Sequence, residues 1–297
     1  MNRRLGRSND DVGSATGEPG AVENVLPDNI EVHTRLATDY ERDEPHFRPE
    51  NKAKVRGNLL RIADRVGTGR LLDVGCGTGF VIGLLADTFD EIHGIDPTRA
   101  MLDQVDVSAG NITLHEGTAE SLPFADGSFD LVTAYSVFHH LADHRPALAE
   151  AARVLRTGGV LYIDLEPNRA FWSAIHEVEQ THGDEADELD EIVAREVAAV
   201  LHVEDDLFAR FAIPQETFRS AEYIKSHLGG FDPDEFAADA RAAGFGRCDA
   251  TYEWFLGQAV LMHGETPADA TAVERHLRRL LPVSASLFKY VRFEVTK

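Results

Sequence analysis

The chain has 297 residues, enough for one large core or for one core with a small accessory lobe. Its composition is that of an ordinary globular protein, and no apolar run reaches the roughly 18 residues needed to span a bilayer. Acidic residues outnumber basic ones by 51 to 29, which gives a formal net charge of −22. Since such a field repels phosphate backbones, the charge balance argues against nucleic acid as a substrate and partner.

The acidity has two candidate origins, and the sequence leaves both open. Only 5 of the 29 basic residues are Lys. Such a surface is typical of adaptation to high internal salt, and the same bias follows from a GC-rich genome. The two cysteines, Cys76 and Cys248, do not predict a disulfide framework, and no apolar segment follows the basic residues of the N-terminus. We therefore expect a cytoplasmic protein with no secretory signal.

The N-terminal quarter divides into a tail and a helical flap. Residues 1–28 are rich in Gly, Ser, Asn and Asp and predict a disordered tail. Residues 30–66 have a helical pattern, interrupted by an irregular stretch around Pro45 and Pro49. Apolar residues at helical spacing over 55–66 predict an amphipathic helix that lies against a sheet.

After this helix, short apolar runs alternate with helical stretches. We expect strands at 70–74, 91–95, 112–116, 129–134 and 159–165, with helices at 79–88, 97–107 and 145–156. Alternation of this kind predicts βαβ units, and hence a parallel sheet that is covered by helices on both faces.

Residues 168–230 break the alternation. They are helical in pattern, strongly acidic and too long for an ordinary connection, so they predict a helical cap inserted after the fifth strand. The α/β pattern then resumes, with helices at 232–243 and 267–281 and strands at 247–255 and 288–295.

The predicted fold is a doubly wound, Rossmann-like α/β sheet of seven mostly parallel strands, the last one antiparallel. The predicted organisation is a tail at 1–28, a cofactor-binding core with its helical flap at 29–167, the cap at 168–230 and the completion of the core at 231–297.

Three glycines follow the first predicted strand in the run Leu-Leu-Asp-Val-Gly-Cys-Gly-Thr-Gly: Gly75, Gly77 and Gly79. Glycines allow a tight turn and let a ligand approach the backbone at the start of the next helix. A dinucleotide-binding loop has the pattern G-x-G-x-x-G, whereas bulky Phe80 occupies the last of those positions here. Asp73, two residues before the first glycine, is awkward beside a pyrophosphate and well suited to the ammonium group of an amino acid.

These residues resemble motif I of the class I S-adenosylmethionine (SAM)-dependent methyltransferases, in particular the type 11-like branch that modifies small molecules. The resemblance implies SAM as the cofactor. Asp96 resembles the acid that ends the family's second strand and holds both ribose hydroxyls, although an acid before Pro97 is also a plausible helix cap. Thr118, Ala119 and Glu120 match the adenine pocket, where the family usually has Asp at the position of Thr118.

The segment 135–141 resembles the one that walls the cofactor, through Ser136, and faces the methyl acceptor. His139 and His140 are the candidate general bases because His titrates near neutral pH; alternatively, the pair only shapes the pocket. In this branch the irregular segment around Tyr40 often closes over the cofactor. The scattered histidines predict no metal site.

The sequence thus predicts an enzyme that transfers a methyl group from SAM to an O, N or C atom of a small molecule by in-line displacement. A protein or RNA methyltransferase and a non-catalytic SAM-binding regulator are the alternatives. A nicotinamide-dependent oxidoreductase is a further one, against which Asp73 and Phe80 argue. The expected partner is the small-molecule acceptor, with neither nucleic acid nor membrane involved. We expect residues 30–66 and 168–230 to determine which acceptor binds.

Overall fold

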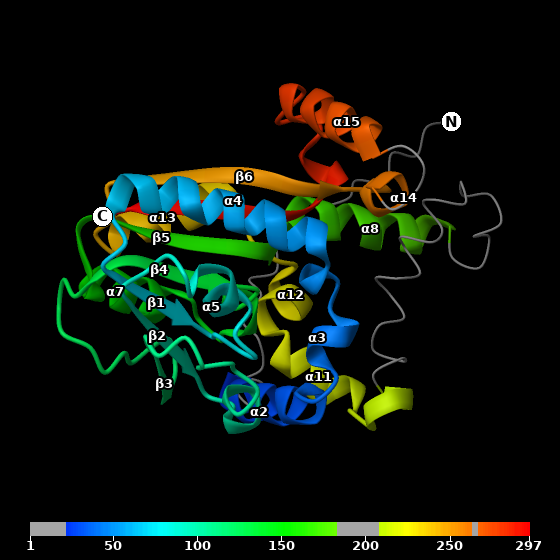
Figure 1. Ribbon diagram of the computed structural model, residues 1–297. Helices are drawn as coiled ribbons and strands as arrows, with labels where there is room; N and C mark the ends of the chain where they lie inside the picture. Colours follow the sequence, from blue (N-terminus) through cyan, green and yellow to red (C-terminus); the bar gives the residue numbers. More distant parts are fainter. Residues whose placement is uncertain (1–21, 183–207, 263–266) are drawn as a thin grey trace, which may run out of the picture.

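The computed structural model describes residues 22–182, 208–262 and 267–297. Its centre is a seven-stranded sheet in the order β3-β2-β1-β4-β5-β7-β6 (Figure 1). The strands are β1 (Arg70–Val74), β2 (Glu91–Asp96), β3 (Ile112–Glu116), β4 (Phe129–Tyr135), β5 (Leu155–Pro167), β6 (Arg247–Phe255) and β7 (Phe288–Thr296). Strands β1 to β5 pair in parallel, and β7 is antiparallel to both β5 and β6. The predicted doubly wound fold, with its last strand antiparallel, is confirmed.

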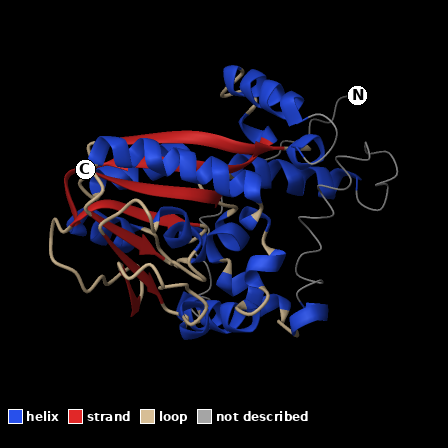
Figure 2. Ribbon diagram, viewed as in Figure 1, coloured by secondary structure: helices blue, strands red, loops and turns tan. Residues whose placement is uncertain are grey.

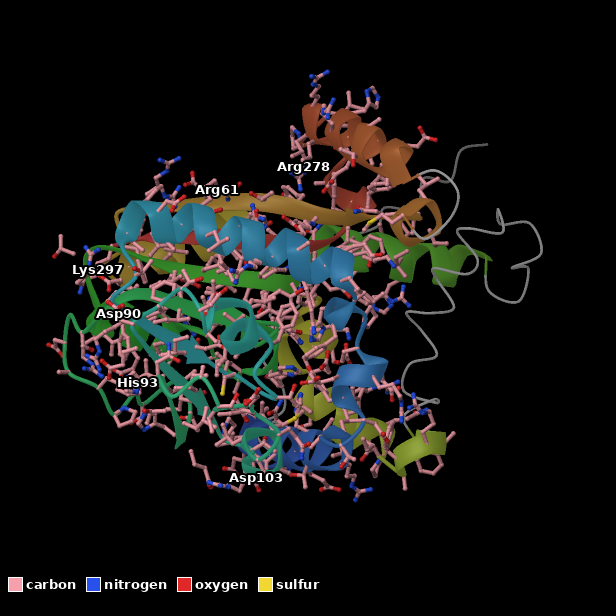
Figure 3. All side chains as sticks on the ribbon, in the orientation of Figure 1. Arg61, Asp90, His93, Asp103, Arg278 and Lys297 are labelled. Atoms are coloured by element: carbon pink, nitrogen blue, oxygen red, sulfur yellow. The ribbon has the colours of Figure 1, made fainter. Side chains whose placement is uncertain are left out.

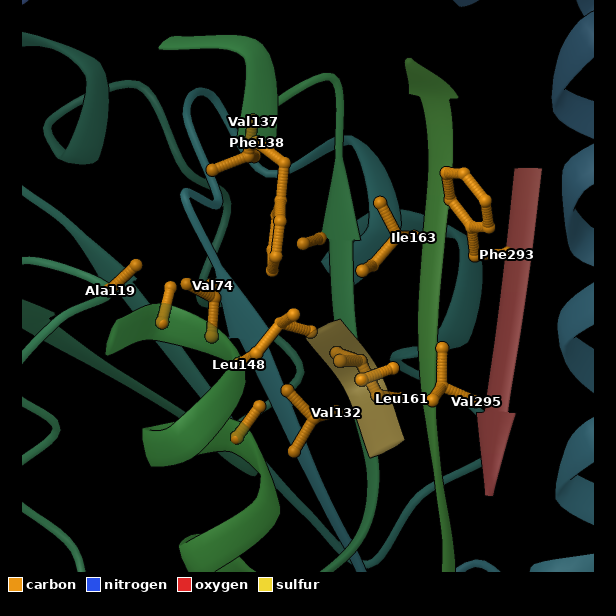
Figure 4. Packing of buried hydrophobic residues seen from close by; sticks show 14 of the residues in the cluster. Val74, Ala119, Val132, Val137, Phe138, Leu148, Leu161, Ile163, Phe293 and Val295 are labelled. Atoms are coloured by element: carbon orange, nitrogen blue, oxygen red, sulfur yellow. The ribbon is translucent and has the colours of Figure 1, made fainter. Parts of the chain in front are cut away.

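Helices cover both faces of the sheet (Figure 2). One face is covered by α4 (Pro49–Val66) and α5 (Phe80–Leu85), and the other by α7 (Arg145–Val154) and α13 (Pro233–Ala242). Consecutive residues of a strand point to opposite faces of the sheet. Leu71 therefore packs on the face covered by α4 and α5, and Leu72 on the face covered by α7 and α13. In Figure 4, Leu148 of α7 lies against Val132 and Leu161. These strands are apolar on both sides because both sides are buried.

The remaining helices lie at the ends and edges of the sheet. They are α2 (Val25–Leu36), α3 (Tyr40–Asp43), η1 (Pro45–Phe47), α6 (Arg99–Leu102), η2 (Phe138–His140), α8 (Arg169–His182), α11 (Gln215–Ala221), α12 (Tyr223–Leu228), α14 (Gln258–Met262), α15 (Pro267–Arg279) and η4 (Ala285–Leu287). On α15, Arg278 (labelled in Figure 3) donates to the carbonyl of Tyr252 on β6. Within the described residues, no helix combines the length and the apolar character needed to cross a membrane.

The predicted end of the N-terminal tail is wrong in detail. The tail was expected to reach residue 28, but α2 begins at Val25, which is 3% exposed and packs among core residues that include Ala119 and Val137. Distant contacts bury Val25, and the local sequence pattern does not report them. The expected irregular stretch around Pro45 and Pro49 separates α3 from α4, and Pro49 begins α4 because a first-turn position requires no backbone N–H. Residues 1–21 of the expected tail lie outside the described residues.

The described helices of segment 168–230 occupy two separate places. Helix α8 packs on β7 and η4, with Phe171, Trp172 and Ile175 in its own apolar cluster. Helices α11 and α12 lie instead beside α2 and η2, at the ends of the central strands (Figure 1). The expected cap therefore reaches the cofactor side of the sheet through the α11–α12 pair; residues 183–207 lie outside the described part of the chain.

Candidate functional site

The glycine loop connects β1 to α5 through three left-handed residues. Gly75, Gly77 and Gly79 have φ angles of 63°, 52° and 92°. A Cβ atom at Gly75 would lie 2.6 Å from the Val137 side chain, so the loop is packed tightly on that side. At Gly77 no atom lies within 4 Å of such a Cβ. The backbone at Gly77 thus faces open space that a ligand can enter.

Asp96 joins this loop to the end of β2. Its Oδ2 accepts from the backbone N–H of Gly77 at 2.9 Å, and its Oδ1 accepts from that of Thr98 at 2.8 Å. The side chain is 8% exposed, and burial raises the pKa of its carboxyl group. Thr98, rather than Asp96, is the N-cap of α6. Each carboxylate oxygen can accept a second hydrogen bond, as two ribose hydroxyls would require.

One cavity collects most of the predicted site residues. Its volume is about 930 Å³, with open solvent at its mouth included. The predicted residues that line it are Gly75, Gly77, Asp96, Thr118, Ala119, Glu120, Ser136 and His140. Ser136 has a φ of 60°, unusual for a residue other than glycine. Helix α2 contributes Val25, Leu26, Asn29 and His33, so the predicted flap forms one wall of the cavity.

Asp73 lines a smaller, adjoining cavity that shares Gly75, Gly77, Tyr40 and Tyr135 with the first. Its side chain is 2% exposed, and Oδ1 accepts from the Thr133 hydroxyl at 2.7 Å. Burial raises the pKa of Asp73 to about 7, although the hydrogen bond from Thr133 opposes the shift. The carboxyl group is therefore poised to ionise fully when a cation binds beside it.

Aromatic rings surround this smaller cavity: Tyr40, His46, Phe47, Phe80 and Tyr135. Two buried polar atoms here have no hydrogen-bond partner among the described residues, the Thr78 hydroxyl and His46 Nδ1. The Glu44 carboxylate is 3.6 Å from that nitrogen, beyond hydrogen-bond distance. Burial lowers the pKa of His46 to about 3, so its ring is neutral. Unpaired buried polar atoms of this kind indicate a polar ligand.

The two candidate bases have different surroundings. His139 lies outside the lining of both cavities, and its Nδ1 is 2.8 Å from Glu166 Oε2. Glu166 is fully buried and also accepts the backbone N–H groups of Val137, Phe138 and His139. Burial lowers the pKa of His139, but Glu166 and Glu222 outweigh it and raise the pKa to about 9. His139 is therefore a charged residue that fixes the segment after β4.

His140 lines the main cavity and is neutral. Its Nδ1 is 2.8 Å from the carbonyl oxygen of Ala221, at the end of α11. Because a carbonyl only accepts, Nδ1 carries the proton and Nε2 keeps a lone pair. Burial and the charge of His139 hold the pKa of His140 well below its usual value. At neutral pH its Nε2 is therefore unprotonated, and the same lowered pKa makes the ring a weaker base than an exposed histidine.

The two histidines and Glu222 form a group with metal-ligand spacing. Their ligand atoms lie within 4.8 Å of one another. However, the Lys225 ammonium is 2.9 Å from Glu222, and His139 is protonated. The negative charges of Glu166 and Glu222 are thus balanced by the positive charges of His139 and Lys225. A metal ion bound here would have to displace the proton of His139, and the Lys225 ammonium would repel it.

The structure adds residues that the sequence analysis missed. Asn29 and His33 enter the cavity from α2, and Glu166 and Glu222 raise the pKa of His139. An acid near the end of the fifth predicted strand was a visible signal for Glu166. No local signal marks Asn29, because its position depends on how α2 docks. Of the predicted residues, Gly79 and His139 line neither cavity.

Comparison with known proteins agrees with this geometry. Residues 72–163 match the model of a methyltransferase domain family. An uncharacterized methyltransferase of Bacillus subtilis is 35% identical over 40% of this chain and 47% of its own length. A probable SAM-dependent methyltransferase of Mycolicibacterium smegmatis is 32% identical over 50% of this chain and 57% of its own. The chain spans about half the length of these curated relatives.

Among solved structures, a SAM-dependent methyltransferase from Archaeoglobus fulgidus shares the fold, with a TM-score of 0.51 and 14% identity. The match covers 88% of this chain and 98% of that one. Residues 72–163 therefore match a methyltransferase domain family, and the similarity to SAM-dependent methyltransferases identifies SAM as the cofactor.

The residues present fit this cofactor. SAM has an ammonium group, a carboxylate, a ribose and an adenine. Asp73 suits the ammonium, and the unpaired Thr78 hydroxyl suits the carboxylate. Asp96 suits the ribose, and the wall at 118–120 suits the adenine.

Proposed function

We propose that the whole protein is a SAM-dependent methyltransferase whose acceptor is a small molecule. The observation that carries this proposal is a single cavity lined by both Asp96 and His140 and walled by α2. An extended polymer would have to displace α2 to reach His140. The surface charge also disfavours RNA.

The proposed mechanism needs little covalent chemistry from the protein. When bound, SAM supplies an electrophilic methyl group on a sulfonium that is already a good leaving group. Asp73 of β1 and Asp96 of β2 hold and orient the cofactor. His140 Nε2 accepts a proton from the acceptor, and the hydrogen bond to Ala221 keeps Nε2 in the accepting tautomer. Aromatic rings surround the smaller cavity beside Asp73 and shield that part of the site from water.

The test compares acceptor classes under identical conditions. Wild-type protein is incubated with methyl-labelled SAM and with the small-molecule, protein or RNA fraction of an extract. We expect label to enter the small-molecule fraction. Label that enters only protein or RNA would contradict the proposed acceptor class, and SAM binding with no transfer to any fraction would favour a regulator.

The role of His140 is tested separately. His140→Asn should lower turnover by roughly 10²-fold or more and leave SAM affinity almost unchanged. His144→Asn is the matched control, because His144 pairs with Asp239 outside both cavities. Normal turnover in His140→Asn would remove the proposed base.

We also place the activity in the cytoplasm. Cys76 and Cys248 are both free thiols, which supports a reducing compartment.

A further inference from the structure

An unpaired side-chain donor lies on α2, the helix that forms one wall of the main cavity. The side-chain Nδ2 of Asn29 is buried and has no hydrogen-bond partner among the described residues, and Asn29 lines the cavity. A buried amide N–H without a partner is unfavourable, so native proteins retain few of them. An unpaired donor in the wall of a ligand cavity therefore indicates that a ligand atom accepts its hydrogen bond.

The position of Asn29 along α2 is well defined. Val32, on another face of the helix, is 2% exposed and packs on Ile213 and Phe218. Arg35 donates to the carbonyl of Ala212 at 2.7 Å. These contacts fix the rotation of α2, and they direct Asn29 and His33 into the cavity together. Residues four apart lie on the same helix face.

The neighbours of Asn29 indicate which part of the ligand it meets. One turn later, His33 acts electrostatically on Asp96, the proposed ribose acid. One turn earlier, Val25 packs in the same cluster as Ala119, on the proposed adenine side. Four residues advance a helix by about 6 Å, roughly the distance from a ribose to the ring it carries. Asn29 therefore lies one helical turn from His33, the residue beside Asp96, in the direction of the proposed adenine site.

The part of the cavity wall formed by Pro97, Met101 and residues 118–120 offers few side-chain donors to the nitrogens of a purine ring. Ala119, Met101 and Pro97 have no polar side-chain atom, and the carboxylate of Glu120 only accepts hydrogen bonds. The Thr118 hydroxyl is the one side-chain donor among these five residues. The ring nitrogens of adenine are acceptors, and an amide N–H is their natural donor.

We infer that Asn29 reads the adenine of the cofactor, by donating its side-chain amide to a purine ring nitrogen from α2. This inference rests on the proposed function, because it takes SAM as the ligand. Through this hydrogen bond, α2 recognises the base in addition to covering the cofactor. Asn29 thereby supplies, from another part of the chain, a polar contact to the base that complements the uncharged Thr118.

The experiment measures S-adenosylhomocysteine (SAH) and its 1-deaza, 3-deaza and 7-deaza analogues by calorimetry. Each analogue replaces one ring nitrogen with a C–H group. Wild-type protein should lose roughly tenfold in affinity for one particular analogue, the one that lacks the nitrogen read by Asn29. Asn29→Leu should bind SAH itself roughly tenfold more weakly and should no longer discriminate against that analogue.

The controls separate recognition from folding. Asn29→Asp keeps the shape but has no donor, and should behave like Asn29→Leu. Asn24→Ala changes an exposed residue that precedes the same helix and makes no capping hydrogen bond, so it should match wild type. A thermal melt shows whether each variant is folded.

Two results would overturn the inference: unchanged SAH affinity in Asn29→Leu, or discrimination among the analogues that stays the same in wild type and variant. Wild-type protein that binds neither SAM nor SAH would instead contradict the proposed function. The two failures are therefore distinguishable.

Discussion

At the scale of single residues, the site is a set of buried carboxyl groups that need positively charged or hydrogen-bonding partners. Asp73 and Asp96 are both less than one-tenth exposed, and burial raises the pKa of each. Asp96 already receives two backbone hydrogen bonds, whereas Asp73 receives one from a side chain. Asp73 is thus the carboxyl group whose charge depends more strongly on its ligand.

This difference predicts a pH dependence of cofactor affinity. In the free protein the pKa of Asp73 is about 7, so the carboxyl group becomes protonated as the pH falls below that value. A ligand ammonium binds the ionised form, so SAH affinity should fall with decreasing pH, at a limit of about tenfold per pH unit. Calorimetry between pH 5.5 and 8.5 measures this slope. Asp73→Asn should bind more weakly with a flatter profile, and the same slope in that variant would contradict the assignment.

At the scale of elements, α2 connects the cofactor cavity to the α11–α12 pair. One face carries Asn29 and His33 into the cavity, and Val32 on another face packs on α11. Helix α11 in turn ends at Ala221, whose carbonyl holds His140. The cofactor wall and the proposed base are therefore linked through one short apolar cluster.

Val32→Ala should loosen this link. The change removes two buried methyl groups, at a cost of about 1–2 kcal/mol. We expect faster amide hydrogen exchange over residues 22–36, unchanged exchange in the central strands, and SAH affinity lowered about threefold to tenfold. Thr34→Ala, at an exposed position of the same helix, is the matched control. Exchange that rises equally across the sheet would contradict a local role for Val32.

How much of this could be predicted from the sequence depends on the range of the contacts involved. The strands and the glycine loop could be predicted because alternation and glycine spacing are local patterns, and both Asp73 and Asp96 end strands that are visible as apolar runs. The position of Asn29 could not, since it depends on α2 docking against α11, almost 200 residues away in the chain. The charged state of His139 depends on two distant carboxylates, Glu166 and Glu222, and the neutral state of His140 depends on its burial and on the charge of His139.

At the scale of the whole molecule, the net charge of −22 destabilises the compact folded state because like charges repel one another. Salt screens exposed charges that are farther apart than the Debye length. Raising the salt concentration from low to molar should therefore stabilise the protein by about 2 kcal/mol, which corresponds to a rise of about 5 °C in Tm. Thermal melts in NaCl and KCl measure the effect. Equal rises indicate screening, and an unchanged or lower Tm would contradict this account.

Calorimetry with SAM, SAH and NAD tests most directly whether Asp96 and the glycine loop hold SAM. We predict that wild-type protein binds SAM and SAH with one site per chain and does not respond to NAD. Asp96→Asn should weaken binding by about 1–3 kcal/mol through the loss of charge-assisted hydrogen bonds. The control Asp103→Asn, which removes an exposed carboxylate beside α6, should have no effect. Tight NAD binding with no response to SAM would contradict the account.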